Sequence, residues 1–352
     1  MSTVDKIIKI LDPQSGRLQE TELTERPGTD LALFETKPGR RMNLEEASTL
    51  ADFPVLLRDG VRSIAFDRYM ATPTTYQEWC LVERSDKQRE DWAEENQLGE
   101  LPIVGEGGAY AEAKQDLDRT VQIANFKRGM ILAVTEEMIR FNRLNILKRQ
   151  AAQLGRSAAR TREQAAMSVI NTSGNYGRTT ADNDIGNNTA STVFSAEGLN
   201  LAMTTLRTMK DRKSGAYLDV MPDTLIVGPR LEVAAKQLLL SPTLQIPGDG
   251  VTTAKVYGTG VTNPFRGQVK QIIVSARFAT SYQWCLMEAK QAVVFQVVDD
   301  LQILQESVGG VQHEGYFKYD VVRYRARDWF GAGMLNDRYA FLSTSSSAPA
   351  VA

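Results

Sequence analysis

Histidine and cysteine are nearly absent from the sequence, which contains only His313, Cys80 and Cys285. A zinc site built from several histidine or cysteine ligands is therefore excluded, and so are iron–sulfur clusters and c-type haem attachment. Two cysteines also cannot make a disulfide scaffold, which fits a reducing compartment. Because both cysteines lie in apolar segments, next to Trp79 and Trp284, we expect buried thiols with a structural role.

Long apolar runs and a large net charge are also missing. No stretch approaches the roughly 18 apolar residues of a membrane span, and the first eleven residues do not resemble a secretory signal. The 41 basic and 43 acidic side chains leave a formal net charge of −2. This balance argues against coating nucleic acid by bulk charge, although a local basic face remains compatible with it. We expect a soluble protein made in the cytosol, with no cofactor, no metal and no membrane partner.

Motifs for catalysis or phosphate binding are missing as well. No GxxxxGK[ST] sequence occurs, and Gly258-Thr-Gly260 lacks the third glycine of a dinucleotide site. His313 has neither a nucleophile nor an orienting acid in a local motif. Among 43 acidic residues a catalytic carboxylate pair cannot be identified by spacing. An enzyme that uses carboxylates therefore stays open as an alternative.

With 42% hydrophobic residues the chain can bury a core, but its first 74 residues indicate an arm with short helices. Residues 3–11 have the spacing of a short amphipathic helix. Residues 12–41 contain several prolines and glycines without a sustained period, which favours extended chain. Asn43 with Glu46 resembles a capping box, and the apolar pattern after Pro54 predicts a further helix.

Two strand-like segments, residues 75–83 and 120–134, flank a long acidic excursion. From Glu83 to Arg119 eleven acidic residues face five basic ones. A structureless loop of this length is unusual inside a compact domain, so we favour a hairpin arm that packs on another chain over a disordered loop. Its candidate contact residues are Glu90, Asp91, Trp92, Glu94, Glu95 and Glu106.

A long helix is predicted over residues 135–171, with Thr135 as its cap. Small and apolar residues from Leu144 to Ala165 recur at steps of three and four and form one narrow face. The helix would be roughly 54 Å long, a spine against which other elements pack closely. Its other faces are basic and either solvated or in contact with phosphate or an acidic neighbour. The basic residues are Arg140, Arg143, Lys148, Arg149, Arg156, Arg160 and Arg162, against the single acid Glu163.

The rest of the chain predicts a compact α+β region and a return strand. Residues 195–315 alternate short helices with strands such as 224–227 and 284–287. Residues 316–329 form a strand in which alternation places Arg323, Arg325 and Arg327 on one face. A short strand at 336–342 and a flexible tail over 343–352 complete the expected order.

This order of parts resembles the major capsid protein of tailed bacteriophages, with the Hong Kong ninety-seven or Johnson fold. The stretches that carry the resemblance are Leu101–Tyr110, Thr135–Ile139, Ala158–Arg162, Asp223–Arg230 and Tyr319–Arg327.

The resemblance implies an α+β fold with the following divisions. Residues 1–74 would form an N-terminal arm and 75–128 an extended hairpin loop. Residues 129–194 and 316–342 would form a peripheral domain around the spine helix, and 195–315 a compact axial domain, followed by the tail.

The resemblance also implies a function. The chain would assemble into hexamers and pentamers of an icosahedral shell enclosing double-stranded DNA. Implied partners are further copies of the chain, a separate scaffolding protein, a portal, the packaged DNA and, as a further candidate, a decoration protein. The shell would assemble in the bacterial cytoplasm and become the virion capsid.

Some members of the family join subunits by a Lys–Asn bond, for which Lys87, Lys114 and Asn336 are weak candidates. An encapsulin-like nanocompartment shell is the alternative within the same fold. The carboxylate-using enzyme is less favoured than either kind of shell.

Overall fold

The computed structural model divides the chain into two units, Met1–Ser63 and Ile64–Ala352. Within the described part of the chain, no helix is both long and apolar enough to cross a membrane. The described residues are 8–11, 18–21, 53–95, 101, 103–110, 112, 117–135, 137–138, 141, 144–176, 188–211, 215–242, 262–306 and 321–348.

The first unit contains an antiparallel pair of short strands, β1 (Ile8–Leu11) and β2 (Leu18–Thr21). The predicted amphipathic helix at 3–11 is therefore wrong for residues 8–11. The isoleucines at positions 8 and 10 also fit the period of two that is typical of a strand. The pairing with β2 shows that these residues form a strand and not a helix. β2 agrees with the extended chain predicted over 12–41.

Helix α1 (Phe53–Ala71) begins in the first unit and continues into the second. It confirms the helix predicted after Pro54, which lies in its first turn, where the missing N–H breaks no helical hydrogen bond. The possible cap at Asn43 lies outside the described residues.

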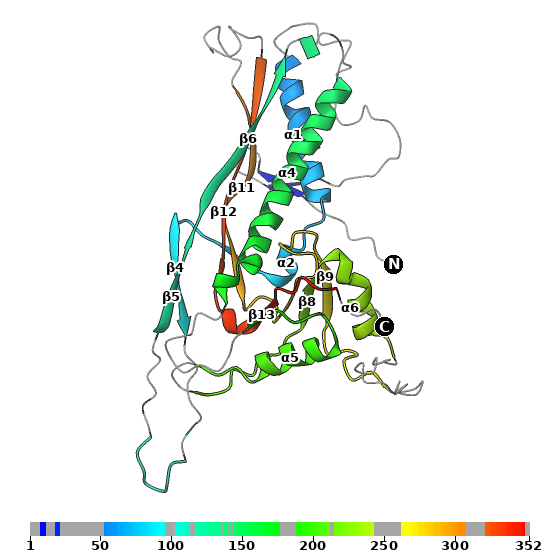
Figure 1. Ribbon diagram of the computed structural model, residues 1–352. Coiled ribbons are helices and arrows are strands. Elements are labelled where there is room, and N and C mark those ends of the chain that lie inside the picture. The colour runs from blue at the N-terminus through cyan, green and yellow to red at the C-terminus, as the bar shows by residue number, and fades with distance from the viewer. Residues whose placement is uncertain are drawn as a thin grey trace, which may run out of the picture. The chain divides into compact units, whose positions relative to one another are not determined.

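In the second unit a four-stranded sheet is covered on one face by helix α4 (Leu144–Asn171) (Figure 1). β11 and β12 pair antiparallel, as do β12 and β6, whereas β3 runs parallel to β11. Along β12 every second side chain, from Val322 to Phe330, is buried. The strand order is β3 (Leu81–Arg84), β11 (Val293–Gln305), β12 (Val321–Met334) and β6 (Phe126–Thr135).

A second sheet has five strands and carries helices α5 (Ala196–Arg207) and α6 (Glu232–Leu240). Its order is β7 (Thr189–Ala190), β13 (Ala340–Ser343), β10 (Trp284–Met287), β8 (Thr224–Val227) and β9 (Gln271–Val274). The predicted strands at 224–227 and 284–287 are confirmed. Short 3-10 turns lie at Ser173–Asn175, Pro229–Leu231 and Asp337–Tyr339.

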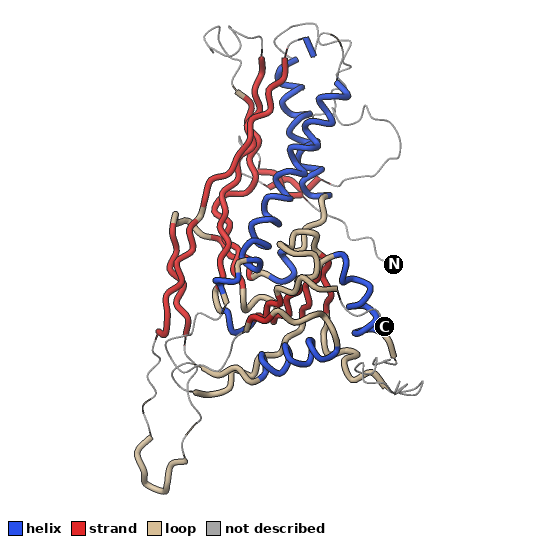
Figure 2. The backbone as a smooth tube through the Cα atoms, viewed as in Figure 1, coloured by secondary structure: helices blue, strands red, loops and turns tan. Residues whose placement is uncertain are grey.

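One hydrophobic core joins the two sheets, which Figure 2 shows as separate groups of strands. Ile226 and Met287 of the five-stranded sheet belong to the same buried cluster as Phe295 and Phe330 of the four-stranded sheet. Ile170, near the end of α4, belongs to this cluster as well. The second unit is therefore held together by continuous apolar packing.

The acidic excursion begins and ends as a hairpin of β4 (Arg89–Glu95) and antiparallel β5 (Leu117–Ala124). Val121 and Ile123 pack against Val294 of β11, which anchors the base of the hairpin to the sheet. The predicted hairpin is thus confirmed, whereas its packing on another chain stays a prediction.

Two predicted element boundaries are wrong. β6 continues through Thr135, which pairs with Val321, so α4 begins at Leu144 and not at residue 135. Strand pairing overrides the capping pattern there. The segment predicted as a strand over 75–83 contains a helical turn, α2 (Tyr76–Trp79), before β3.

The strand pairings also cut across the predicted domain limits. β11, assigned by sequence to the axial region, pairs with β12 in the four-stranded sheet. β7 and β13, assigned to the peripheral region, belong to the five-stranded sheet. Ser343 lies in β13 and Ser345 is 1% exposed, so the tail predicted as flexible from residue 343 is packed there. Sequence order alone could not show these crossings, because pairing partners are far apart in the chain.

The small residues of α4 allow α1 to approach it closely. A Cβ atom added at Gly155 would lie 2.0 Å from the carbonyl oxygen of Ala65 in α1. Leu154 and Ala65 are both buried in the same cluster. This confirms the expectation of a spine helix with a narrow, small-residue face.

Gly155→Ala is expected to destabilise the protein by about 1–3 kcal/mol, because α1 must move away from α4. Gly174→Ala is the matched control, since an added Cβ there meets nothing within 4 Å. Urea unfolding of both variants measures the difference. Equal stability of the two variants would show that the α1–α4 contact is looser than described.

Candidate subunit-interaction surface

Arg162 of α4 is buried and bound by Asp328 of β12. Its Nε donates to Asp328 Oδ2 at 2.8 Å and its Nη2 to Oδ1 at 2.7 Å, and the two residues are 4% and 5% exposed. Arg162 was predicted to face DNA or another subunit. That prediction is wrong, because the guanidinium is enclosed within its own chain.

The surroundings of Arg162 explain how the charge is tolerated. Burial acts to lower the pKa of Arg162, but the hydrogen bonds and negative charge of Asp328 outweigh it, so the pKa lies above its ordinary value. Tyr69 of α1 lies under the guanidinium, 5.6 Å from ring centre to Cζ. Burial raises the pKa of Tyr69 to about 12, against the opposing effect of Arg162.

The neighbouring Glu163 is also buried, at 2% exposure, and holds the N-terminus of α2. The backbone N–H groups of Thr75 and Tyr76 donate to Glu163 Oε2 at 2.8 and 3.1 Å, and the Thr75 hydroxyl donates to Oε1. A carboxylate at these free N–H groups favours a helical turn. Together with the backbone bonds from Glu78 N–H to Thr75 O and from Cys80 N–H to Tyr76 O, this contact stabilises a helical turn at residues 76–79, where a strand was predicted.

The sequence analysis did not predict that Arg162 pairs with Asp328, nor that Glu163 binds the N-terminus of α2. Asp328 lies on the inward face of β12, between Ala326 and Phe330, which was the available signal for a buried partner. A second buried ion pair was also missed, between Arg338 Nη1 and Asp211 Oδ1 at 3.5 Å. It links the segment that follows α5 to the 3-10 turn at Asp337–Tyr339.

Three exposed arginines form a stripe along α4, which we call the helix stripe: Arg149, Arg156 and Arg160. These arginines stand two positions before Ala151, Ala158 and Arg162, respectively, which belong to the packed face of the helix. Two positions correspond to a rotation of about 200°, so each arginine points roughly 160° away from the packed face around the helix axis. The stripe thus lies on the side of α4 that faces away from the sheet. Arg140 and Arg143 lie outside the described residues.

A second basic face lies on the other side of this layer. Arg323, Arg325 and Arg327 occupy alternate positions of β12, between buried neighbours, so the prediction that they share one face is confirmed. Arg323 Nη1 lies 3.8 Å from Glu306 Oε2, and Arg327 Nη2 lies 3.8 Å from Asp299 Oδ2. We call this the strand face, and its charge is partly balanced by local acids.

The predicted contact residues of the hairpin fall into three groups. Glu90 and Trp92 are engaged at the hairpin base: Glu90 Oε2 accepts from Gln296 Nε2 at 3.1 Å, and Trp92 packs against the cluster around Val121. Asp91 is exposed and accepts from Gln122 at 3.0 Å. Glu94 and Glu95 lie in β4, but their side chains are outside the described residues.

Glu106 lies in an exposed turn between Gly105 and Gly108, closed by a 2.9 Å backbone hydrogen bond. Gly107 has a φ of 77°, which explains the glycine there. Beside this turn Leu101, Ile103 and Tyr110 are 96%, 101% and 86% exposed. Large apolar side chains so fully exposed indicate a contact surface.

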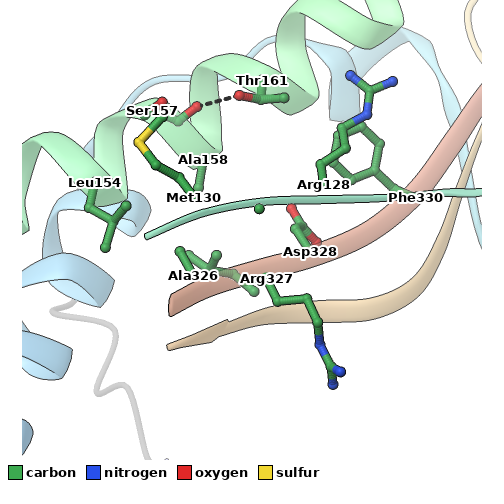
Figure 3. A pocket seen from close by; sticks show the side chains of 12 residues that line it. Arg128, Met130, Leu154, Ser157, Ala158, Thr161, Ala326, Arg327, Asp328 and Phe330 are labelled. Carbon is green, nitrogen blue, oxygen red and sulfur yellow. Dashed lines mark hydrogen bonds between the residues drawn. The ribbon is translucent and has the colours of Figure 1, made fainter. Parts of the chain in front are cut away.

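An open cavity of about 130 Å³ lies between α4 and the strands β6 and β12 (Figure 3). Leu154, Ser157 and Ala158 of α4 line one wall, and Met130 of β6 and Phe330 of β12 line the other. The Thr161 hydroxyl donates to the Ser157 carbonyl at 2.7 Å. The cavity arises because α4 presents small residues to Met130.

The remaining sequence candidates are the two cysteines, Asn336, Lys114 and His313. Cys80 and Cys285 are buried, as predicted, and burial raises the pKa of both thiols, to about 12 for Cys285. Asn336 Oδ1 accepts from the Arg338 N–H at 3.0 Å. Lys114 and His313 lie outside the described residues, so a Lys–Asn bond stays a prediction. Among the described residues no cluster of His, Cys, Asp and Glu could hold a metal ion.

Arg162→Met is expected to cost about 3–5 kcal/mol of unfolding free energy, because it leaves the Asp328 carboxylate buried without its partner. Arg160→Met, two positions away and exposed, should change stability by less than about 0.5 kcal/mol. Urea unfolding measures both. The double variant Arg162→Met/Asp328→Leu should recover most of the loss, and failure to recover would contradict a role limited to the ion pair.

Among solved structures, the chain resembles a capsid of the cyanophage P-SCSP1u, with 13% identity, a TM-score of 0.49 and coverage of 79% of this chain and 89% of the other. Mycobacterium phage Bobi gives 12% identity, a TM-score of 0.48 and coverage of 78% and 91%. A virus-like particle from Pyrococcus furiosus gives 14% identity, a TM-score of 0.47 and coverage of 80% of this chain and 97% of the other. No match was found among curated proteins.

The decisive comparison is with a protein family described as phage capsid protein, which matches residues 119–343. The matched stretch contains most of β5, all of β6 and α4, the whole five-stranded sheet and every strand of the four-stranded sheet except β3. It includes the helix stripe and the strand face, and it covers well over half of the chain. The chain belongs to the phage capsid protein family and is a shell-forming structural protein.

Proposed function

We propose that the chain is a major capsid protein that assembles into hexamers and pentamers of an icosahedral shell enclosing double-stranded DNA. The single observation that carries this proposal is the family match across residues 119–343. The fold supports it, because the hairpin extends from the packed core and ends in a tip with exposed apolar side chains. Such arms gain stability by packing on another copy.

The sheets support a division into the parts of a capsid subunit. We assign the four-stranded sheet with α4 to the peripheral domain and the five-stranded sheet with α5 and α6 to the axial domain. The hairpin of β4 and β5 is the extended loop. This division follows strand pairing, so β11 moves to the peripheral domain, and β7 and β13 move to the axial domain.

Further partners follow from this role. We propose assembly in the bacterial cytoplasm around a separate scaffolding protein, with a portal at one vertex and DNA packaged later. A decoration protein on the outer surface is a further candidate. The family indicates a structural protein and therefore disfavours the carboxylate-using enzyme.

Electron microscopy of the chain co-expressed with scaffolding protein tests shell formation. Closed particles tens of nanometres across are expected, because the chain supplies the whole shell wall. Small uniform particles, in a preparation where the scaffold is present and folded, would contradict the proposal. Shells that enclose a cargo protein, and not DNA, would favour a nanocompartment.

The two basic faces suggest which side of the wall meets DNA. They lie on opposite sides of the α4–sheet layer, so only one of them can face the interior of a closed shell. The only acid within α4 is Glu163, which is buried against α2, so α4 itself supplies no counter-charge to the helix stripe. Arg323 and Arg327 have acids nearby. We therefore assign the helix stripe to the DNA side.

Charge reversal of Arg156 and Arg160 to Glu is expected to reduce DNA packaging strongly while empty shells still form. Phosphate contacts depend on positive charge, whereas shell assembly would not. The matched control reverses Arg323 and Arg325 on the strand face and should leave packaging close to wild type. The amount of DNA per shell, measured after nuclease treatment, is compared between the two variants. Equal loss of shells and DNA in the helix-stripe variant would instead identify a subunit contact.

A further inference from the structure

We propose that the hairpin of β4 and β5 is joined to the four-stranded sheet by a rigid root, in which Asn125 is the residue that fixes the angle between them. The hairpin root consists of residues 85–88, Asn125, and the facing residues Gln296 of β11 and Gly331 of β12. The root is a property of the single chain, whereas its consequence for assembly rests on the proposed shell function.

Asn125 is the single residue between β5 and β6, where the chain changes its pairing partner. Before it, Ala124 pairs with Arg89 of β4, and after it, Phe126 pairs with Phe330 of β12. Figure 1 shows that β5 and β6 follow one another in one general direction. A two-stranded ribbon alone is marginally stable, so the angle of the hairpin depends on what holds this junction.

The side chain of Asn125 holds the segment that leads into β4. Its Nδ2 donates to the carbonyl oxygen of Lys87 at 2.8 Å and to Ser85 Oγ at 3.3 Å, and its backbone N–H donates to the carbonyl oxygen of Gln88 at 2.8 Å. Ser85 donates its own N–H to the carbonyl oxygen of Val297 in β11 at 3.1 Å. Asn125 is 3% exposed and Ser85 is 8% exposed, so water competes little for these bonds. One buried residue therefore ties both strands of the hairpin to the sheet.

Two glycines of β12 let β5 lie directly on the sheet. Gly331 and Gly333 occupy alternate positions, and neither has a positive φ. A Cβ atom added at Gly331 would lie 2.6 Å from the carbonyl oxygen of Ala124 and 2.5 Å from Asn125 Oδ1. One added at Gly333 would lie 2.7 Å from Cγ1 of Ile123. Because the backbone at these positions does not require glycine, the close approach of β5 explains both residues.

The other strand of the hairpin, β4, is held by a second buried polar contact. Gln296 of β11 is fully buried and donates from Nε2 to Glu90 Oε2 at 3.1 Å. Gln296 pairs with Gly331 in the sheet, so this contact lies beside the one made by Asn125. The apolar packing at the base of the hairpin adds to both. Contacts on both strands oppose a swing of the hairpin about the junction.

The angle at the root matters because the hairpin acts as a lever. β4 pairs with β5 without interruption along residues 89–94, so an angle set at the root is carried outward. At about 3.3 Å per residue, β5 spans about 26 Å. A tilt of about 10° at Asn125 would displace the Leu117 end by about 5 Å, roughly the spacing between neighbouring strands. The root therefore sets the direction in which the arm leaves the subunit.

Spin-label distance measurements on the full-length chain test the root. Ala93→Cys on β4 and Ala133→Cys on β6 carry the two nitroxides, because both alanines are exposed and both native cysteines are buried. At about 3.3 Å per residue the labels lie on the order of 40 Å apart. Labelled chains are diluted into an excess of unlabelled chain, so that only distances within one subunit are measured.

The labelled chain is expected to give one narrow distance distribution. Adding Asn125→Ala should broaden it by about 5 Å, the displacement that the tilt above produces. Gln122→Ala is the matched control, because it removes an exposed amide from the same hairpin, where Gln122 donates to Asp91. It should leave the distribution narrow.

A broad distribution in the labelled chain itself, or an equally narrow one after Asn125→Ala, would overturn the rigid root. If urea unfolding shows that Asn125→Ala is not folded, Ser85→Ala carries the same test. It removes only the hydroxyl that accepts from Asn125 Nδ2 and from the Lys87 N–H. A smaller broadening is expected, and none would count against the root.

Electron microscopy of the unlabelled variants tests the consequence for assembly. Asn125→Ala is expected to give several-fold fewer uniform closed shells than wild type, with irregular particles in their place, whereas Gln122→Ala should give wild-type shells. Uniform shells from Asn125→Ala, despite a broadened distance distribution, would show that the root does not direct the arm in assembly. Wild-type chains that form no shells would overturn the proposed function and leave the spin-label result on the root standing.

Discussion

Arg162 and Glu163 place two charges inside the protein at adjacent positions of one helix, and each needs a partner because an unpaired buried charge costs about 3–5 kcal/mol. Successive helix positions point about 100° apart, so the two residues reach different elements. Arg162 fixes β12 through Asp328, and Glu163 fixes α2 through the N–H groups of Thr75 and Tyr76. The position of α4 against the sheet, and of the chain entering β3, depends on this pair.

Once α4 is fixed in this way, the functional surfaces follow. The sheet-facing side of the helix carries small residues and leaves the cavity beside Met130, while the opposite side carries the helix stripe. β12 turns its own arginines to the other side of the layer. The wall therefore has two chemically different sides, and the hairpin leaves it at the base formed by Val121 and Ile123. A subunit with such sides and an arm is suited to a closed shell.

The sequence predicted the features that depend on local pattern: the hairpin, the long amphipathic helix, the strand at 224–227 and the shared face of the β12 arginines. It failed where distant pairing decides. Thr135 has the pattern of a helix cap but pairs with Val321 in a strand, and β11 joins β12 rather than its neighbours in sequence. From the sequence, Arg162 was grouped with the basic residues of the helix surface. The structure instead buries it against the carboxylate of Asp328, which occupies an inward position of β12.

The most direct test is a cryo-electron microscopy map of the DNA-filled particle at side-chain resolution. The account predicts that α4 lines the interior, with Arg156 and Arg160 toward the DNA and the β12 arginines on the other side of the wall. A shell in which the strand face turns toward the DNA would contradict it.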